Sequence, residues 1–212
     1  MKFYLSSYKI GGTHEVEKLK KLLPVNKRVA YIANSLDFSN DLDRRKQSEQ
    51  EDIDQLTQVG LKVENFDLRN FFNKPEKLEK DIKNYGVIWV RGGNVFVLRQ
   101  AMKLSGFDNL LKKLAKEDNE ILYGGYSAGV CILAPSLKGL ELVDDITQHP
   151  YSEKPDLIWE GLGLIDYVIV PHFQSDHPES ELVNAVVEKY KKDGTKFKAL
   201  RDGEVIITEN KL

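Results

Sequence analysis

Apolar residues along the chain fall into short continuous runs that alternate with longer stretches of helical spacing. Short runs bounded by polar or turn residues predict buried strands; they lie at 2–6, 28–33, 61–66, 85–90, 121–123 and 167–170. Apolar residues that recur every three or four positions predict helices; these lie at 16–23, 53–59, from Pro75 onward, 95–103, 107–117 and 178–192. Strands that alternate with helices are typical of βαβ units, so the sequence predicts an α/β fold with a mostly parallel sheet and helices on both faces.

Three segments follow this pattern less clearly. Residues 34–51 are strongly polar, which fits either a loop before a helix or the exposed first turns of a long helix that ends at Gly60. Thr13 follows a pair of glycines and is a candidate N-cap of the first helix. Residues 201–204 place Asp-Gly between two strand-like segments, which predicts a hairpin at the end of the chain.

Length, composition and charge narrow the class of protein. The 212 residues fit a single domain over 1–212, and 41% hydrophobic with 30% charged residues is typical of a globular chain with a core. A net charge of −2 without a basic block argues against nucleic-acid binding, and no apolar run is long enough to span a membrane. The start of the chain is too polar for a secretory signal, and the single Cys131 cannot form an intrachain disulfide, so we expect a cytoplasmic protein. A homodimer is compatible with this sequence, which does not fix the oligomeric state.

The segment 121–135 carries the most distinctive chemistry. Gly125, Ser127 and Gly129 match the G-x-S-x-G pattern of a nucleophile elbow, between a strand-like lead-in and a helix-like exit. Glycine is needed on both sides because side chains there would collide with the neighbouring strand and helix. The alternative is an ordinary glycine-rich turn with a solvated serine.

Two other segments also leave the carboxyl ends of predicted strands, where chemistry is concentrated in parallel α/β sheets. Arg91-Gly92-Gly93-Asn94 follows one strand, and its glycine amides can point into a site. The same segment is equally compatible with a plain turn in which Asn94 caps the next helix. His172 directly follows another strand and can accept a proton from a serine near neutral pH, or it can be a buried structural histidine.

A catalytic triad also requires a carboxylate to orient the imidazole. The order serine, acid, histidine places that carboxylate between Ser127 and His172, and the pattern does not choose among the acids there: Glu141, Asp144, Asp145, Glu153, Asp156, Glu160 and Asp166. Cys131 stands one helical turn beyond the elbow and is interpreted as a small buried residue. No metal-ligand spacing, dinucleotide fingerprint or phosphate-binding loop is present, so we expect neither a metal nor a cofactor.

Taken jointly, these segments resemble the peptidase E family of serine peptidases, which includes aspartyl dipeptidase and is related to the cyanophycinases. The matching residues are Gly92 to Phe96 with Leu98, Gly125 to Gly129, Pro135, Gly161 to Leu164, and Pro171 to Phe173. The resemblance implies a flavodoxin-like three-layer sandwich related to class I glutamine amidotransferases. It further implies that Ser127 is the nucleophile and His172 the base. The Gly93 and Ala128 amides would form the oxyanion hole, and Asn94 would contact the substrate. The acid would be Asp145, with Asp144 and Glu160 in reserve.

One position departs from the family pattern. Aspartyl dipeptidases carry an arginine shortly after the catalytic histidine, whereas here no arginine occurs between His172 and Arg201. A substrate carboxylate needs a cationic partner, so we do not expect strict specificity for Asp-X dipeptides unless Arg91 supplies the charge. The predicted function is therefore a serine peptidase that hydrolyses small peptides through an acyl-enzyme. The alternatives are an esterase or another acyl or amide hydrolase, and a catalytically silent α/β domain that binds a small ligand.

Overall fold

The computed structural model describes residues 1–117, 119–153 and 155–209. The strands are β1 Lys2–Ser6, β2 Arg28–Ile32, β3 Lys62–Asn65, β4 Val87–Val90, β5 Leu122–Tyr126, β6 Val168–Val170, β7 Phe197–Ala199 and β8 Val205–Glu209. The α-helices are α1 Thr13–Leu22, α2 Leu42–Gln58, α3 Pro75–Ile82, α4 Val95–Ser105, α5 Phe107–Lys116, α6 Ala128–Cys131 and α7 Ser180–Asp193. Short 3₁₀ turns are η1 Asn34–Leu36, η2 Leu68–Phe71 and η3 Leu140–Leu142.

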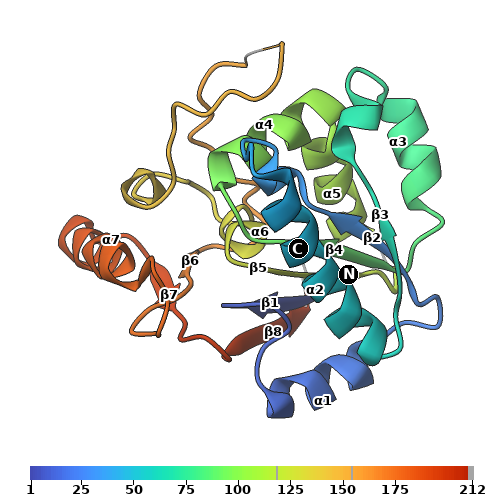
Figure 1. Cartoon of the computed structure of the whole chain (residues 1–212), viewed down its shortest axis with the longest axis horizontal. Helices are drawn as coiled ribbons and strands as arrows, with labels where there is room; N and C mark the ends of the chain where they lie inside the picture. Colours follow the sequence, from blue (N-terminus) through green and yellow to red (C-terminus); the bar gives the residue numbers. More distant parts are fainter. Residues whose placement is uncertain (118, 154, 210–212) are drawn as a thin grey trace.

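A six-stranded sheet forms the centre of the molecule, in the order β3-β2-β4-β5-β1-β8 (Figure 1). All neighbouring pairs are parallel except β1 and β8. Strands β6 and β7 form a separate parallel pair beside α7. Because β1, β4 and β5 are adjacent and parallel, the loops that follow them open at one edge of the sheet.

Successive side chains of the central strands point to opposite faces, as expected for strands buried on both sides. On one face, Val29, Tyr31 and Trp89 pack with the apolar residues of α1 and α2. On the other face, Ile32 and Val90 pack in a larger cluster with residues from α3, α4, α5 and α7. The layers confirm the predicted α/β sandwich with a mostly parallel sheet.

Three local predictions can be compared with the structure. The polar segment is a short loop followed by the long helix α2, whose N-cap Asp41 accepts a hydrogen bond from the Arg44 amide. Thr13 is the first residue of α1 rather than its cap, and Gly12 occupies the cap position without a side-chain bond. The predicted hairpin at 201–204 is wrong. A turn is present, but β7 pairs with β6 and β8 pairs with β1.

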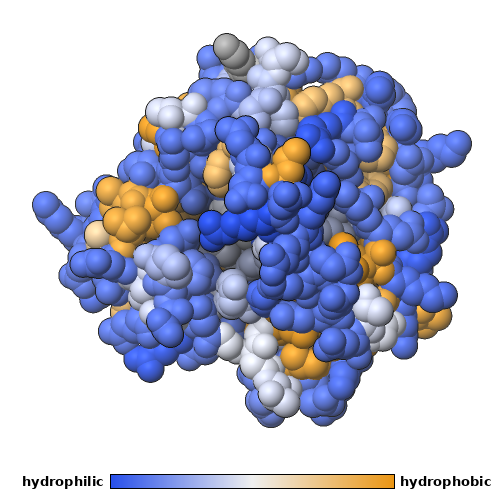
Figure 2. Space-filling view, viewed as in Figure 1, coloured by the Kyte–Doolittle hydropathy of each residue, from blue (hydrophilic) through white to orange (hydrophobic). Residues whose placement is uncertain are grey.

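The face shown in Figure 2 is mostly hydrophilic and is hollowed near its centre, over α6 and the end of β5. Exposed apolar side chains include Leu142 and Leu182, the latter on α7, where Figure 2 also shows an apolar patch. Within the described part of the chain, none of the helices has the length and apolar character required to cross a bilayer.

Candidate active site

Ser127 stands at the sharp turn between β5 and α6. Its backbone angles, φ 49° and ψ −119°, lie in a region that non-glycine residues rarely adopt. A Cβ at Gly125 or at Gly129 would overlap the Val90 carbonyl oxygen of β4. The two glycines therefore let the turn press against the neighbouring strand, which explains the G-x-S-x-G spacing.

The loop after β4 lies directly against this turn. A Cβ at Gly92 would stand 2.8 Å from the Ser127 Cβ, and one at Gly93, where φ is 139°, would stand 2.7 Å from the Ser35 carbonyl oxygen. Neither the Gly93 amide nor the Ala128 amide donates a hydrogen bond to another described residue. Each of these residues lines a cavity together with Ser127, so the two amides are candidates for an oxyanion hole.

Asn94 ends this loop as the N-cap of α4. Its side-chain oxygen accepts hydrogen bonds from the Phe96 and Val97 amides, and its Nδ2 donates to the Asp145 carbonyl at 2.8 Å. Because these bonds use the side chain and bury it, the geometry gives no support to the predicted contact between Asn94 and substrate. The capping interpretation of Asn94 is confirmed.

His172 follows β6 and faces an acid that the sequence reasoning did not select. Its Nδ1 lies 2.8 Å from Oδ1 of Asp202, which comes after His172 in the chain. The Ser7 hydroxyl lies between the two segments, because it accepts a bond from the His172 amide and donates to Asp202 Oδ1, both at 2.8 Å. The Asp202 amide in turn donates to the Ser175 hydroxyl. The imidazole is therefore held by a carboxylate that is itself fixed from two directions.

The acids predicted to face His172 lie elsewhere, so that expectation was wrong. The Asp145 carboxylate is exposed and caps its own turn by accepting bonds from Thr147 and Gln148. Glu160 is exposed, and its main chain pairs with Ser136. Asp144 comes nearer to the serine, but its carboxylate accepts the Val95 amide at the start of α4.

Two cavities meet at the candidate serine and histidine. The larger, of about 150 Å³, includes Gly92, Gly93 and Tyr8 in its wall. The smaller, of about 20 Å³, is mostly apolar and reaches Ala128 and Cys131. Ser127, His172 and Glu179 line both cavities, so the predicted convergence of Gly93, Ser127 and His172 is confirmed. No hydrogen bond joins the Ser127 hydroxyl to the His172 ring, and such bonds are often loose before substrate binds.

The surroundings shift the ionisation of several groups. Burial lowers the pKa of His172, and the neighbouring His177 lowers it further, while Asp202 opposes both effects. Burial raises the pKa of Asp144 to about 7, although its bond from the Val95 amide acts in the opposite direction. Burial also raises the pKa of the Cys131 thiol well above its usual value, which disfavours a reactive thiolate.

His172, His177 and Glu179 offer atoms within 4.8 Å of one another and are a candidate metal cluster. The two imidazoles, however, stack in parallel with centroids 3.7 Å apart and planes at 8°. Lone pairs in parallel planes do not converge on one ion, and both Nδ1 atoms are already bonded, to Asp202 and to the Glu179 amide. The arrangement does not fit a metal, and our expectation that the protein uses none stays a prediction.

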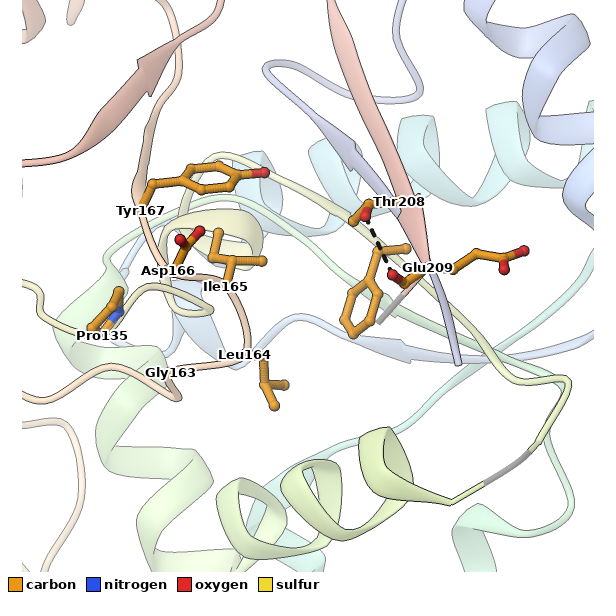
Figure 3. A pocket seen from close by; sticks show the side chains of 9 residues that line it. Pro135, Gly163, Leu164, Ile165, Asp166, Tyr167, Thr208 and Glu209 are labelled. Carbon is orange, nitrogen blue, oxygen red and sulfur yellow. Dashed lines mark hydrogen bonds between the residues drawn. The ribbon is translucent and has the colours of Figure 1, made fainter. Parts of the chain in front are cut away.

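A further cavity of about 420 Å³ lies at the other end of the sheet (Figure 3). Phe3, near the start of β1, lines it together with Pro135, Tyr167 and Thr208. Figure 3 shows Tyr167, Ile165 and Thr208 along its wall, with Thr208 hydrogen-bonded to the Glu209 carbonyl. Since Ser127 follows the carboxyl end of β5 and β5 runs parallel to β1, this cavity is remote from the candidate nucleophile.

Comparison with known proteins places this geometry in context. The chain is 28% identical over 136 residues to the uncharacterized peptidase Lmo0363 of Listeria monocytogenes and 29% identical over 133 residues to the uncharacterized peptidase PM1590 of Pasteurella multocida. These matches cover 64% and 63% of the chain. They span 62% and 60% of the two relatives, less than two thirds of their lengths.

Solved structures share the fold. A crystal structure described as a candidate peptidase E protein from Listeria monocytogenes EGD-e aligns with a TM-score of 0.69 at 22% identity, over 98% of both chains. A peptidase from an acI-B1 Actinobacterium aligns with a TM-score of 0.67 at 14% identity, over 98% of this chain and 83% of that one. The flavodoxin-like architecture expected from the resemblance to peptidase E is thereby confirmed.

A family model described as peptidase family S51 matches residues 6–212, nearly the whole chain. The match includes the elbow serine, the glycine loop, the histidine and Asp202. The resemblance to the peptidase E family is thus confirmed. On this evidence, the chain belongs to peptidase family S51.

Proposed function

We propose that this protein hydrolyses small peptides through an acyl-enzyme formed on Ser127, with residues 1–212 acting as one catalytic domain. The observation that carries the proposal is the arrangement of Ser127 and His172 around shared cavities, with Asp202 on the far ring nitrogen of His172. In this arrangement the carboxylate holds Nδ1–H, so that Nε2 is the nitrogen free to accept a proton. The reaction needs no cofactor.

Each group has a defined role in the proposed reaction. Ser127 Oγ attacks the scissile carbonyl carbon while His172 Nε2 takes the hydroxyl proton, and the Gly93 and Ala128 amides hold the developing oxyanion. The same imidazole then gives its proton to the leaving amine, and the acyl-enzyme forms. A water molecule, activated by His172, hydrolyses the ester and regenerates the serine.

The dimensions and charges of the site favour short, neutral acyl residues. The two cavities are small, about 150 and 20 Å³, which suits a short peptide. Asp144 and Glu179 line the smaller cavity and no lysine or arginine does so among the described residues, so an aspartate side chain there would lack a cationic partner. Arg201 is exposed and donates to the Gln174 side chain, away from both cavities. We therefore propose a dipeptidase without strict Asp-X specificity.

A labelling and substrate panel tests the proposal. A fluorophosphonate should label the wild-type protein at Ser127, because the reagent traps activated serines. Ala-Leu should be hydrolysed at least as fast as Asp-Leu, and both faster than the ethyl ester of N-acetyl-alanine. Absence of labelling would favour the silent ligand-binding domain. Preference for the ester would favour an esterase, and a hundredfold preference for Asp-Leu would contradict the proposed specificity.

The pH dependence of activity provides an independent prediction. Because burial and His177 lower the pKa of His172, the base stays neutral to more acidic pH than an ordinary imidazole with a pKa of about 6.5. We expect the acid limb of kcat/KM for Ala-Leu to have its midpoint below that value. Replacement of His177 by phenylalanine keeps a flat ring but removes the repulsion, so the midpoint should move upward. An acid limb above pH 7 in the wild type would contradict this assignment.

A further inference from the structure

Two cations face the larger cavity, and the anions that neutralise them lie behind it. Lys9 and Arg91 both line this cavity, next to Ser127. Lys9 Nζ is 2.8 Å from Glu51, and Arg91 Nε is 3.5 Å from Asp52, but neither acid is part of the cavity wall. Glu179 also lines this cavity, so a ligand there meets two cations against one carboxylate.

The Arg91 guanidinium also has unused hydrogen-bond donors, although its side chain is only 7% exposed. Nη2 donates to the Ser48 hydroxyl at 2.9 Å, whereas Nε and Nη1 have no acceptor. Asp52 Oδ2 lies 3.5 Å from Nε and accepts from Tyr31 and Tyr126, while Asp52 Oδ1 has no partner. Buried donors without acceptors are costly, and a ligand carboxylate in the adjoining cavity is attracted by the guanidinium charge.

The smaller cavity lacks such cations. Asp144 and Glu179 line it, and no lysine or arginine does so among the described residues. His172 borders both cavities and must face the leaving amine, because it protonates that nitrogen. In a dipeptide, the α-carboxylate is attached one carbon from this nitrogen. It has to lie near His172, and the cavity with Lys9 and Arg91 is the one that can accept it.

We propose that Arg91 and Lys9 form a subsite for the α-carboxylate of the residue that leaves, so that the preferred substrates end one residue after the scissile bond. This inference rests on the proposed peptidase function, because that function defines the leaving residue. Arg91 supplies a fixed positive charge from the loop after β4. Lys9, on the loop after β1, adds the second charge at the cavity rim.

The test is binding to the Ser127→Ala variant, which does not require turnover. Calorimetry compares the dipeptide Ala-Leu with its C-terminal amide, which lacks the carboxylate and keeps every other group. We expect the acid to bind at least tenfold more tightly than the amide, as one good charge-assisted contact can supply. Equal affinity for the two ligands, or no binding of the acid, would overturn the subsite.

Second substitutions in the same background assign the contact. Arg91→Gln and Lys9→Gln should each reduce the acid-to-amide ratio several-fold, and Lys113→Gln, which removes an exposed cation on α5, should leave the ratio unchanged. Because Arg91→Gln leaves Asp52 buried without its partner, the pair Arg91→Gln/Asp52→Asn serves if the single variant does not fold. A ratio unaffected by changes at both Arg91 and Lys9 would overturn the assignment.

Two further arms separate related outcomes. If the amide of Asp-Leu binds tenfold more tightly than the amide of Ala-Leu, and this gain needs Arg91, the subsite takes an acidic side chain and our assignment to the α-carboxylate is wrong. Hydrolysis of Ala-Leu by the wild-type protein is measured separately. If the wild-type protein does not hydrolyse Ala-Leu, the proposed function is contradicted. The ratio of the affinities for the acid and the amide would still decide whether the carboxylate subsite exists.

Discussion

Replacement of Ser127 by alanine is expected to lower kcat/KM for Ala-Leu by at least about three orders of magnitude, because the acyl-enzyme can no longer form. The fold should be retained. The Ser127 hydroxyl makes no hydrogen bond within the described residues, so its removal leaves no buried partner unsatisfied. Activity is measured by release of leucine, and folding by circular dichroism and thermal unfolding.

The control for this experiment is Cys131→Ser. Cys131 lies one helical turn after the serine, but its thiol is buried and donates to the Ile169 carbonyl at 3.3 Å. A hydroxyl can make the same bond, so this variant should keep most of its activity. Wild-type turnover by Ser127→Ala would rule out the serine mechanism, and loss of activity in Cys131→Ser would point to the thiol instead.

Much of the fold could be predicted from the sequence because the deciding interactions are local or periodic. Val87 to Val90 form a continuous apolar run because β4 is buried on both faces, and Val183, Val186 and Val187 share a helical face because α7 packs one side against the core. The elbow was recognisable for a similar reason. Gly125 and Gly129 approach Val90 so closely that a side chain would not fit, so the two glycines occur at a fixed distance from the serine in the sequence.

The acid of the candidate triad could not be predicted in this way. Asp202 reaches His172 because β7 pairs in parallel with β6, with Val170 opposite Ala199, which sets the turns after both strands side by side. Such a pairing over about thirty residues has no local signature. The Asp-Gly turn instead suggested a hairpin, and expecting the acid between Ser127 and His172 excluded Asp202 from consideration.

The acids that were selected have a different task in the structure. Asp144 accepts the Val95 amide, and the Asp145 main chain accepts the side chain of Asn94, so both secure the loop after η3 to the start of α4. That loop contributes Val143 and Asp144 to the wall of the smaller cavity. Asp144 and Asp145 therefore help to shape the site and do not contact the imidazole.

Replacement of Asp202 by asparagine is expected to lower kcat for Ala-Leu by about three to four orders of magnitude, with a much smaller change in KM. An asparagine can place an amide N–H against His172 Nδ1. The ring would then carry its proton on Nε2, where it cannot accept the serine proton. The variant is nearly isosteric. The Ser7 hydroxyl, which would meet Nδ2 in place of Oδ1, can donate to the Leu200 carbonyl, 3.3 Å away, so we expect the variant to fold.

Asp145→Asn is the matched control, since it makes the same chemical change at the acid first expected to complete the triad. The Asp145 carboxylate is exposed and bonded only to Thr147 and Gln148, so this variant should keep kcat within about threefold of the wild type and lose little stability. A large loss in Asp145→Asn together with near-normal turnover in Asp202→Asn would reverse the assignment. Near-normal turnover in both would mean that His172 acts without a carboxylate, because Asp202 is the acid bonded to its ring in this structure. A loss of kcat in Asp202→Asn alone would support Asp202 as the acid of the triad. The chemical step would then depend on the contact between Asp202 and His172, which the pairing of β6 with β7 brings about.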